Sequence, residues 1–150
     1  MENQQLMLLF RAHRHLCAIP VERVIETMRP LPIEPLAIAS GAVLGLCRIR
    51  GTSVPVVDTG ALFGAQGEAG SARFIVLRIE NRIVALAVES VTGIRAVPSH
   101  ALQDLPPLLG EANAALVASI GAADGAFLLV LRTARILAEA HAAMAEAAYG

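Results

Sequence analysis

Apolar residues in this chain occur in short runs, and most of the runs come in pairs separated by a few polar residues. Runs of this length that are rich in valine, isoleucine and leucine are typical of β-strands, and the polar residues between paired runs indicate hairpin turns. The predicted strands cover residues 6–12, 15–19, 46–49, 54–57, 73–79, 83–88, 116–120 and 126–131, with further extended segments at 26–31 and 92–97.

The segment 45–64 combines charge with an apolar hairpin in an otherwise apolar chain. Arg50 and Gly51 form a turn signal between two strand-like runs, and Asp58 stands where the second run ends. An aspartate in that position can cap the first turn of a helix, so a short helical turn is predicted at 60–63.

The C-terminal part differs from the rest, because residues 134–148 are rich in alanine and repeat with a helical period. This is the only long helix that the pattern predicts, and its apolar face is expected to pack across the strands. That face comprises Ile136, Leu137, Ala140, Met144 and Ala147.

An internal repeat relates the two halves of the chain. Residues 10–24 align without a gap on residues 77–91, and residues 54–62 resemble residues 127–135. Each half then contains a hairpin, an extended strand and a second hairpin. The prediction is an all-β fold of two similar small barrels packed together, because closure into a barrel removes exposed strand edges. The whole chain, 1–150, forms a single domain, with a first lobe at about 6–64, a second at about 73–131, and the C-terminal helix on both.

Composition narrows the possible functions. Of the 150 residues, 55% are hydrophobic and only 17% are charged, so either the core is large or some apolar surface is kept for a partner. A net charge of −1 gives no support for binding to nucleic acid or to an anionic membrane. The N-terminal residues lack the pattern of a signal peptide, and glycines and an aspartate interrupt the apolar segment 114–131, so a cytoplasmic protein without a membrane insertion is expected.

Candidate catalytic and metal-binding residues do not form a recognisable motif. His13, His15 and Cys17 could share a strand face, but no second ligand cluster accompanies them, so a hairpin turn with a buried thiol is favoured. Glu22 and Glu89, which occupy matching places in the repeat, are expected to be structural. No nucleophile motif or phosphate-binding glycine pattern appears beside these carboxylates. We therefore expect no enzyme activity, no cofactor and no metal.

Arg50 has two possible roles. It is either a solvated arginine on an exposed face, which Arg48 would share at two residues' distance, or a guanidinium anchor for a protein partner.

The order of motifs resembles that of the CheW-like domains of bacterial chemosensory systems, from about residue 6 to about residue 137. The opening Phe10…Ala18-Ile19-Pro20-Val21, the hairpin Ile49-Arg50-Gly51 with Pro55-Val56-Val57-Asp58, and the later Gly93-Ile94-Arg95-Ala96-Val97-Pro98 carry the resemblance. The resemblance implies an all-β fold of two small, interlocked five-stranded β-barrels. It also implies a non-catalytic adaptor, which couples the cytoplasmic tips of methyl-accepting chemoreceptors to the regulatory domain of a CheA-type histidine kinase.

The resemblance also assigns roles to individual residues. Glu26 and Arg50 are the candidates for the receptor-side surface, and Val88 is expected to line the groove between the barrels. Gly51, Pro55 and Asp58 belong to the structural signature, in which Asp58 orders the turn.

The chain departs from the family pattern at four positions, of which Glu89 in place of the aspartate of the second lobe is the mildest change. Arg48 replaces an asparagine of the signature, and Thr59-Gly60 replace a leucine-arginine pair at an end of the signature that is expected to face the surface. These changes leave open a second function, a divergent module of a non-flagellar pathway that binds or caps the kinase or associates weakly with itself.

Overall fold

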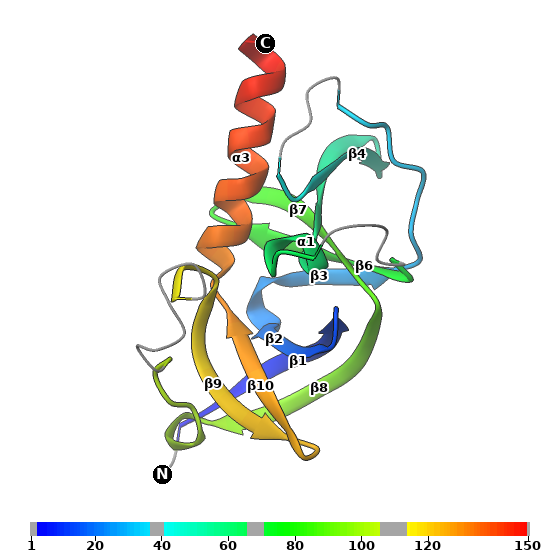
Figure 1. The fold of residues 1–150 in the computed structure, drawn as a ribbon. Helices are drawn as coiled ribbons and strands as arrows, with labels where there is room; N and C mark the ends of the chain where they lie inside the picture. Colours follow the sequence, from blue (N-terminus) through cyan, green and yellow to red (C-terminus); the bar gives the residue numbers. More distant parts are fainter. Residues whose placement is uncertain (1–2, 37–40, 66–70, 106–113, 150) are drawn as a thin grey trace.

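The computed structural model describes residues 3–36, 41–65, 71–105 and 114–149, which form two five-stranded β-sheets and a long C-terminal helix (Figure 1). The predicted all-β class with a C-terminal helix is confirmed. The strands are β1 (Gln4–Ala12), β2 (His15–Pro20), β3 (Val24–Met28), β4 (Val43–Ile49), β5 (Thr52–Asp58), β6 (Arg73–Ile79), β7 (Arg82–Val88), β8 (Ser90–Pro98), β9 (Val117–Ala123) and β10 (Ala126–Leu131). The helices are η1 (Val21–Arg23), α1 (Thr59–Leu62), η2 (Ser99–Ala101) and α3 (Thr133–Tyr149).

Each sheet takes strands from both halves of the chain. Sheet A has the order β8-β1-β2-β10-β9, and sheet B has the order β3-β6-β7-β5-β4. When each strand is replaced by its counterpart in the repeat, the order of one sheet becomes the order of the other. The boundaries 6–64 and 73–131 therefore follow the repeat in the sequence but not the hydrogen bonding of the sheets. The two halves exchange strands, because the first hairpin of each half pairs with the later strands of the other.

The sheets are not closed barrels, which corrects that part of the prediction. Among the described residues, no pairing joins β8 to β9 or β3 to β4, so each sheet keeps two edge strands. The outer edges of β4 and β9 are each covered at one point by an isolated bridge, Glu34 with Leu46 and Gln103 with Ile120. Short bridges of this kind protect an edge without closing the sheet.

The four hairpins among the described residues have two-residue turns in which both residues adopt a positive φ, the conformation of a type I′ turn. This turn matches the twist of the flanking strands, which explains why the polar pairs in the sequence mark the hairpins well. Two of the turns end in glycine and one in asparagine, whereas the β1–β2 turn has neither. The residues are His13-Arg14, Arg50-Gly51, Glu80-Asn81 and Asp124-Gly125.

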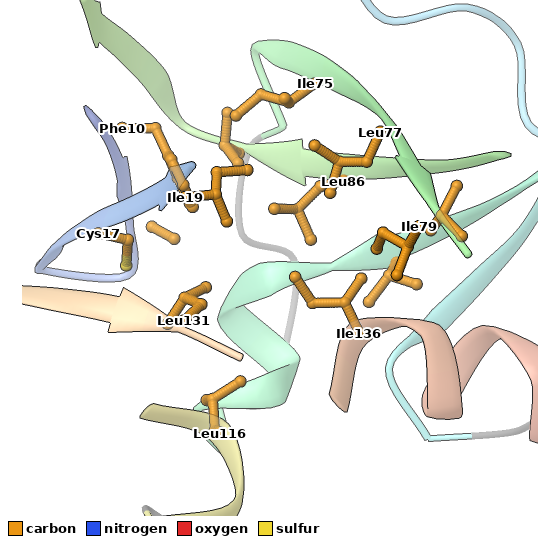
Figure 2. Packing of buried hydrophobic residues seen from close by; sticks show 14 of the residues in the cluster. Phe10, Cys17, Ile19, Ile75, Leu77, Ile79, Leu86, Leu116, Leu131 and Ile136 are labelled. Atoms are coloured by element: carbon orange, nitrogen blue, oxygen red, sulfur yellow. The ribbon is translucent and has the colours of Figure 1, made fainter. Parts of the chain in front are cut away.

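Three hydrophobic clusters hold the fold together. The largest lies between the sheets and includes Phe10, Leu77 and Leu86, all fully buried (Figure 2). Each sheet also encloses a smaller cluster of its own, around Phe74 in sheet B and around Leu9 in sheet A. The strands β1, β2, β6 and β7 are thus buried on both faces, which produces continuous apolar runs and accounts for much of the high hydrophobic content.

Helix α3 follows β10 of sheet A and packs against strands of sheet B, mainly β5 (Figure 1). Ile136 and Ala140 are buried in the central cluster and Leu137 is partly buried, as the predicted apolar face requires. Met144 differs from that expectation, since 37% of the surface of this residue is exposed. The side chain of Ala147 lies outside the described residues.

Candidate functional site

The structure brings together two of the residues predicted for partner binding. Arg50, in the β4–β5 turn, donates from Nε to Glu26 Oε2 at 3.0 Å and from Nη2 to Glu26 Oε1 at 2.9 Å. Glu26 lies on the edge strand β3, so this bidentate ion pair connects the β4–β5 turn to the opposite edge of sheet B. The Arg50 side chain is 77% exposed and that of Glu26 is 25% exposed. Arg50 is therefore paired with Glu26, although most of its side chain remains exposed.

A second ion pair occupies the equivalent place in sheet A. Arg95 on β8 donates from Nη1 and Nη2 to the two carboxylate oxygens of Asp124, both at 3.1 Å. Asp124 is the first residue of the β9–β10 turn, as Arg50 is of the β4–β5 turn, and β8 is the opposite edge strand. Our sequence analysis missed this pair. The two hairpins resemble each other in sequence, and each has a charged residue followed by glycine at its turn, Arg50-Gly51 and Asp124-Gly125. This likeness could have indicated the second ion pair.

Val88, the third predicted partner-binding residue, is buried. It is the last residue of β7, is 2% exposed, and belongs to the central cluster. Together with Asp58, Gly60 and Glu89 it borders a cavity of only about 10 Å³. Val88 therefore lies beneath the surface, near the junction of the sheets, and is not part of the Glu26–Arg50 surface.

Asp58 caps α1, as predicted, by accepting a hydrogen bond at Oδ1 from the backbone N–H of Gly60 at 3.1 Å. Burial raises the pKa of this carboxyl above its usual value of 3.8, while the N–H groups of Gly60 and Ala61 and the charge of His13 act in the opposite direction. The signature residue thus holds the exit of β5 and the start of α1 in place.

The β1–β2 turn is fastened to the other half of the chain by Glu89. The backbone N–H of His13 donates to Glu89 Oε1 at 3.0 Å, and the backbone N–H of Glu89 donates to the carbonyl of Arg11 at 2.9 Å. The ring of His15 lies 4.3 Å from that of Phe63, which follows α1, and burial together with His13 lowers the pKa of His15. These contacts support the structural role predicted for Glu89.

Gly51 and Pro55 fit their structural roles. Gly51 has a φ of 81°, and a Cβ there would meet no atom within 4 Å, so the dihedral angle and not lack of space favours glycine. Pro55 lies just before residues 56–58, where β5 pairs with β7, and a residue without an N–H is tolerated at such a place.

The departure at Thr59-Gly60 does not face the surface, contrary to the expectation. Both residues are buried at the start of α1, because the chain turns inward after Asp58. Arg48, in contrast, is exposed on β4 opposite Ser53.

Among the described residues, the structure shows neither a metal-ligand cluster nor an activated thiol. Within the described ranges, no three His, Cys, Asp or Glu side chains gather into a group that could hold a metal. Cys17 and Cys47 are free and buried, and burial raises the pKa of Cys17 to about 12, so this thiol stays protonated. Among the described residues, no helix is long and apolar enough to cross a membrane.

The fold combines two exchanged β-sheets, exposed ion pairs at their edges and a large shared core. A family model described as the CheW-like domain matches residues 6–141. The chain therefore belongs to the CheW-like domain family, as the motif order predicted.

Similar proteins agree with this family. The chain is 23% identical over 127 residues to the chemotaxis protein CheW of Rhizobium meliloti (strain 1021), covering 83% of this chain and 82% of that protein. It is 29% identical over 128 residues to the chemotaxis protein CheA of Cereibacter sphaeroides, covering 73% of this chain and 18% of that protein.

Among solved structures, the scaffolding protein TtCheW from Thermoanaerobacter tengcongensis matches with a TM-score of 0.77 at 20% identity, over 87% of this chain and 90% of that one. This match supports the two-sheet fold. The family model and the curated relatives confirm the predicted resemblance to CheW-like domains.

Proposed function

We propose that this protein is a non-catalytic adaptor that couples the cytoplasmic tip of a chemoreceptor to the regulatory domain of a CheA-type histidine kinase. The observation that carries the proposal is the CheW-like match over residues 6–141. The similarity to a stretch of a CheA protein supports a kinase partner that contains a like domain. Such an adaptor acts in the cytoplasm and reaches receptor arrays through its partners.

Holding receptor and kinase on one molecule raises their effective concentration without new chemistry. On this proposal Glu26 and Arg50 belong to the receptor-side surface, and most of the Arg50 side chain is available there. Because the two residues bind each other, the pair presents a fixed guanidinium plane instead of a mobile side chain, which lowers the entropy cost of binding. Val88 acts from beneath, by supporting the packing between the sheets.

Pull-down of the purified protein with a receptor cytoplasmic fragment and with the kinase regulatory domain tests the proposal. Binding to both is expected, and binding to neither would contradict the adaptor function. Arg50→Glu should weaken receptor binding while thermal unfolding changes little. Arg73→Glu, at another exposed arginine of sheet B, is the matched control and should bind normally.

The swapped variant Glu26→Arg/Arg50→Glu separates contact from positioning. If Arg50 contacts the receptor, the swapped pair keeps the fold but does not restore binding. Restored binding would mean that the ion pair acts only by holding β3 and the β4–β5 turn together.

A second candidate, a CheW-like module that caps the kinase or associates with itself in a non-flagellar pathway, draws support from exposed apolar residues. Phe127 is 76% exposed and Ile94 is 62% exposed, both in sheet A. Sedimentation of the protein at micromolar concentration, alone and with the kinase domain, distinguishes the two. Phe127→Ser should reduce self-association if this candidate holds.

A further inference from the structure

A groove of about 320 Å³ lies between α3 and the ends of β5 and β7 near their hairpin turns. Its apolar part is formed by Pro55, Ile83 and a stripe on α3. That stripe consists of Leu137, Ala140 and Met144, spaced by three and four residues, so the three side chains lie along one face of the helix. The exposure of Met144, which the fold does not explain, has a role if this groove receives a partner.

The polar part of the groove offers hydrogen-bond donors. Arg82 Nη1 lies 2.8 Å from His141 Nδ1. A guanidinium can only donate, so Nδ1 accepts and the imidazole proton resides on Nε2. His141 thus keeps a second donor, and Arg82 has further N–H groups beyond this bond.

Charge on the groove has one sign. None of the described residues that line it is an aspartate or a glutamate, while Ser53, Asn81 and Arg82 contribute donors. Arg48 is the cross-strand partner of Ser53, is exposed, and therefore adds a second guanidinium beside the groove. A partner that brings carboxylates complements this surface.

The backbone at the groove constrains the kind of partner. β5 lies between β7 and β4 in sheet B, and β7 lies between β6 and β5, so neither is an edge strand. An added strand has no free edge to pair with, and binding must use side chains. An apolar stripe between a helix and a sheet is suited to a second helix that lays one face into it.

We propose that this surface, the α3 groove, binds an amphipathic helix of a partner protein that carries carboxylates along its edge. The inference adds a surface that the adaptor function does not assign: the groove adjoins the β4–β5 turn with Arg50, and it lies at the Arg82 end of β7, while Val88 lies at the other end. Six residues of strand separate them, which is roughly 20 Å. The α3 groove is therefore a binding surface separate from the junction near Val88.

Titration of the full chain with designed peptides tests the proposal. The probe is a helical peptide with leucine on one face and glutamate along both edges, and the control peptide has lysine in place of glutamate. We expect saturable binding of the glutamate peptide, followed by calorimetry, with amide NMR shifts at residues 52–55, 81–84 and 137–144. Equal affinity for the lysine peptide would overturn the charge argument, as would a glutamate peptide that does not bind.

Variants locate the binding. Arg82→Glu and Met144→Glu, both at exposed positions, should each weaken the glutamate peptide by about tenfold or more, the usual loss at an interface hot spot. Arg73→Glu should leave its affinity unchanged. Unchanged affinity in both groove variants would refute the site, and displacement by millimolar inorganic phosphate alone would indicate an anion site instead. Because this assay uses a designed peptide and neither receptor nor kinase, its result does not depend on the adaptor function.

Discussion

Sheets A and B have the same strand order and the same turn types, but the ion pairs that span them have opposite polarity. In sheet B the turn carries the arginine and the edge strand carries the glutamate, whereas in sheet A the turn carries the aspartate and the edge strand the arginine. A type I′ turn that approaches the opposite edge strand can thus be joined to it by a pair of either polarity. The repeat determines the backbone, while the charge presented at each sheet is free to differ.

The helices that follow the second hairpin of each half differ more strongly. Helix α3 crosses from sheet A to pack on sheet B, whereas α1 contacts β7 of its own sheet, and only Phe63, just after α1, reaches His15 of sheet A. Helix α1 has 4 residues and α3 has 17. The short helix leaves room for only a small cavity beside the β1–β2 turn, while the long one forms a groove beside the β6–β7 turn. Different binding surfaces can therefore arise from one repeated unit.

The largest effect is expected from the core that the sheets share. Leu77→Ala should lower the free energy of unfolding by about 2–5 kcal/mol, because Leu77 is fully buried between the sheets. Leu9→Ala, in the cluster of sheet A alone, should cost a similar amount. Urea unfolding followed by circular dichroism and by labelling of Cys17 and Cys47 should show one transition in both variants. Two separate transitions would mean that the sheets are independent.

An intermediate effect is expected at Asp58, which has no counterpart charge in sheet A. Asp58→Ala should cost about 1 kcal/mol through loss of the helix cap. Asp58→Asn keeps a capping group and removes the buried charge. Because folding raises the pKa of Asp58, wild-type stability falls as the pH rises from 3.8 towards the higher folded value. Asp58→Asn should therefore gain most, relative to the wild type, at neutral pH.

Thermal unfolding between pH 3 and pH 7 measures this difference. A gap between Asp58→Asn and the wild type that widens as the pH falls would contradict the direction assigned to the pKa.

The β1–β2 turn should allow a stabilising change. Arg14 has a φ of 73° without the glycine found at the same place in the β4–β5 and β9–β10 turns. Arg14→Gly should raise the free energy of unfolding by about 0.5–1 kcal/mol. Glycine avoids the Cβ clash of the left-handed conformation, and this gain exceeds the loss from the greater conformational freedom of glycine in the unfolded chain. The reverse substitution, Gly125→Ala, should destabilise. Denaturant midpoints of both variants check the prediction, and a destabilised Arg14→Gly would contradict it.

The smallest effect is expected at the exposed ion pairs. Asp124→Ala should cost about 0.2–1 kcal/mol, and less at high salt. The swapped variant Arg95→Asp/Asp124→Arg should regain most of that loss and give sheet A the polarity of sheet B. A double-mutant cycle in thermal unfolding measures the coupling. A swap that is worse than both single variants would show that the surrounding charges, and not the turn geometry, set the polarity.

The sequence predicted local features better than their assembly. The turns at His13-Arg14 and Arg50-Gly51, the cap at Asp58 and the start of α3 depend on neighbouring residues and were recognisable from them. The exchange of strands was not recognisable, because the repeat shows which strands resemble one another but not whether a strand pairs within its own half or with the other half.

The site was predicted only in part, because it too depends on how the strands assemble. Glu26 and Arg50 were named from motif positions, yet their mutual hydrogen bonds depend on how sheet B curves to bring its edges together. Val88 was expected beside a groove, but burial of β7 on both faces places it inside. The groove at α3 could not be anticipated, since its two sides come from segments far apart in the chain.

The exchange of strands also sets the order in which the protein can be completed during translation. All strands of sheet B come from residues 24–88 and are present once β7 has left the ribosome. The β1–β2 hairpin of sheet A is made first, but its partner β10 ends only at Leu131. At about 5–20 residues per second, that hairpin waits roughly 5–20 seconds for β10. The nascent chain therefore leaves the β2 edge of this apolar hairpin without its strand partner until β10 is complete.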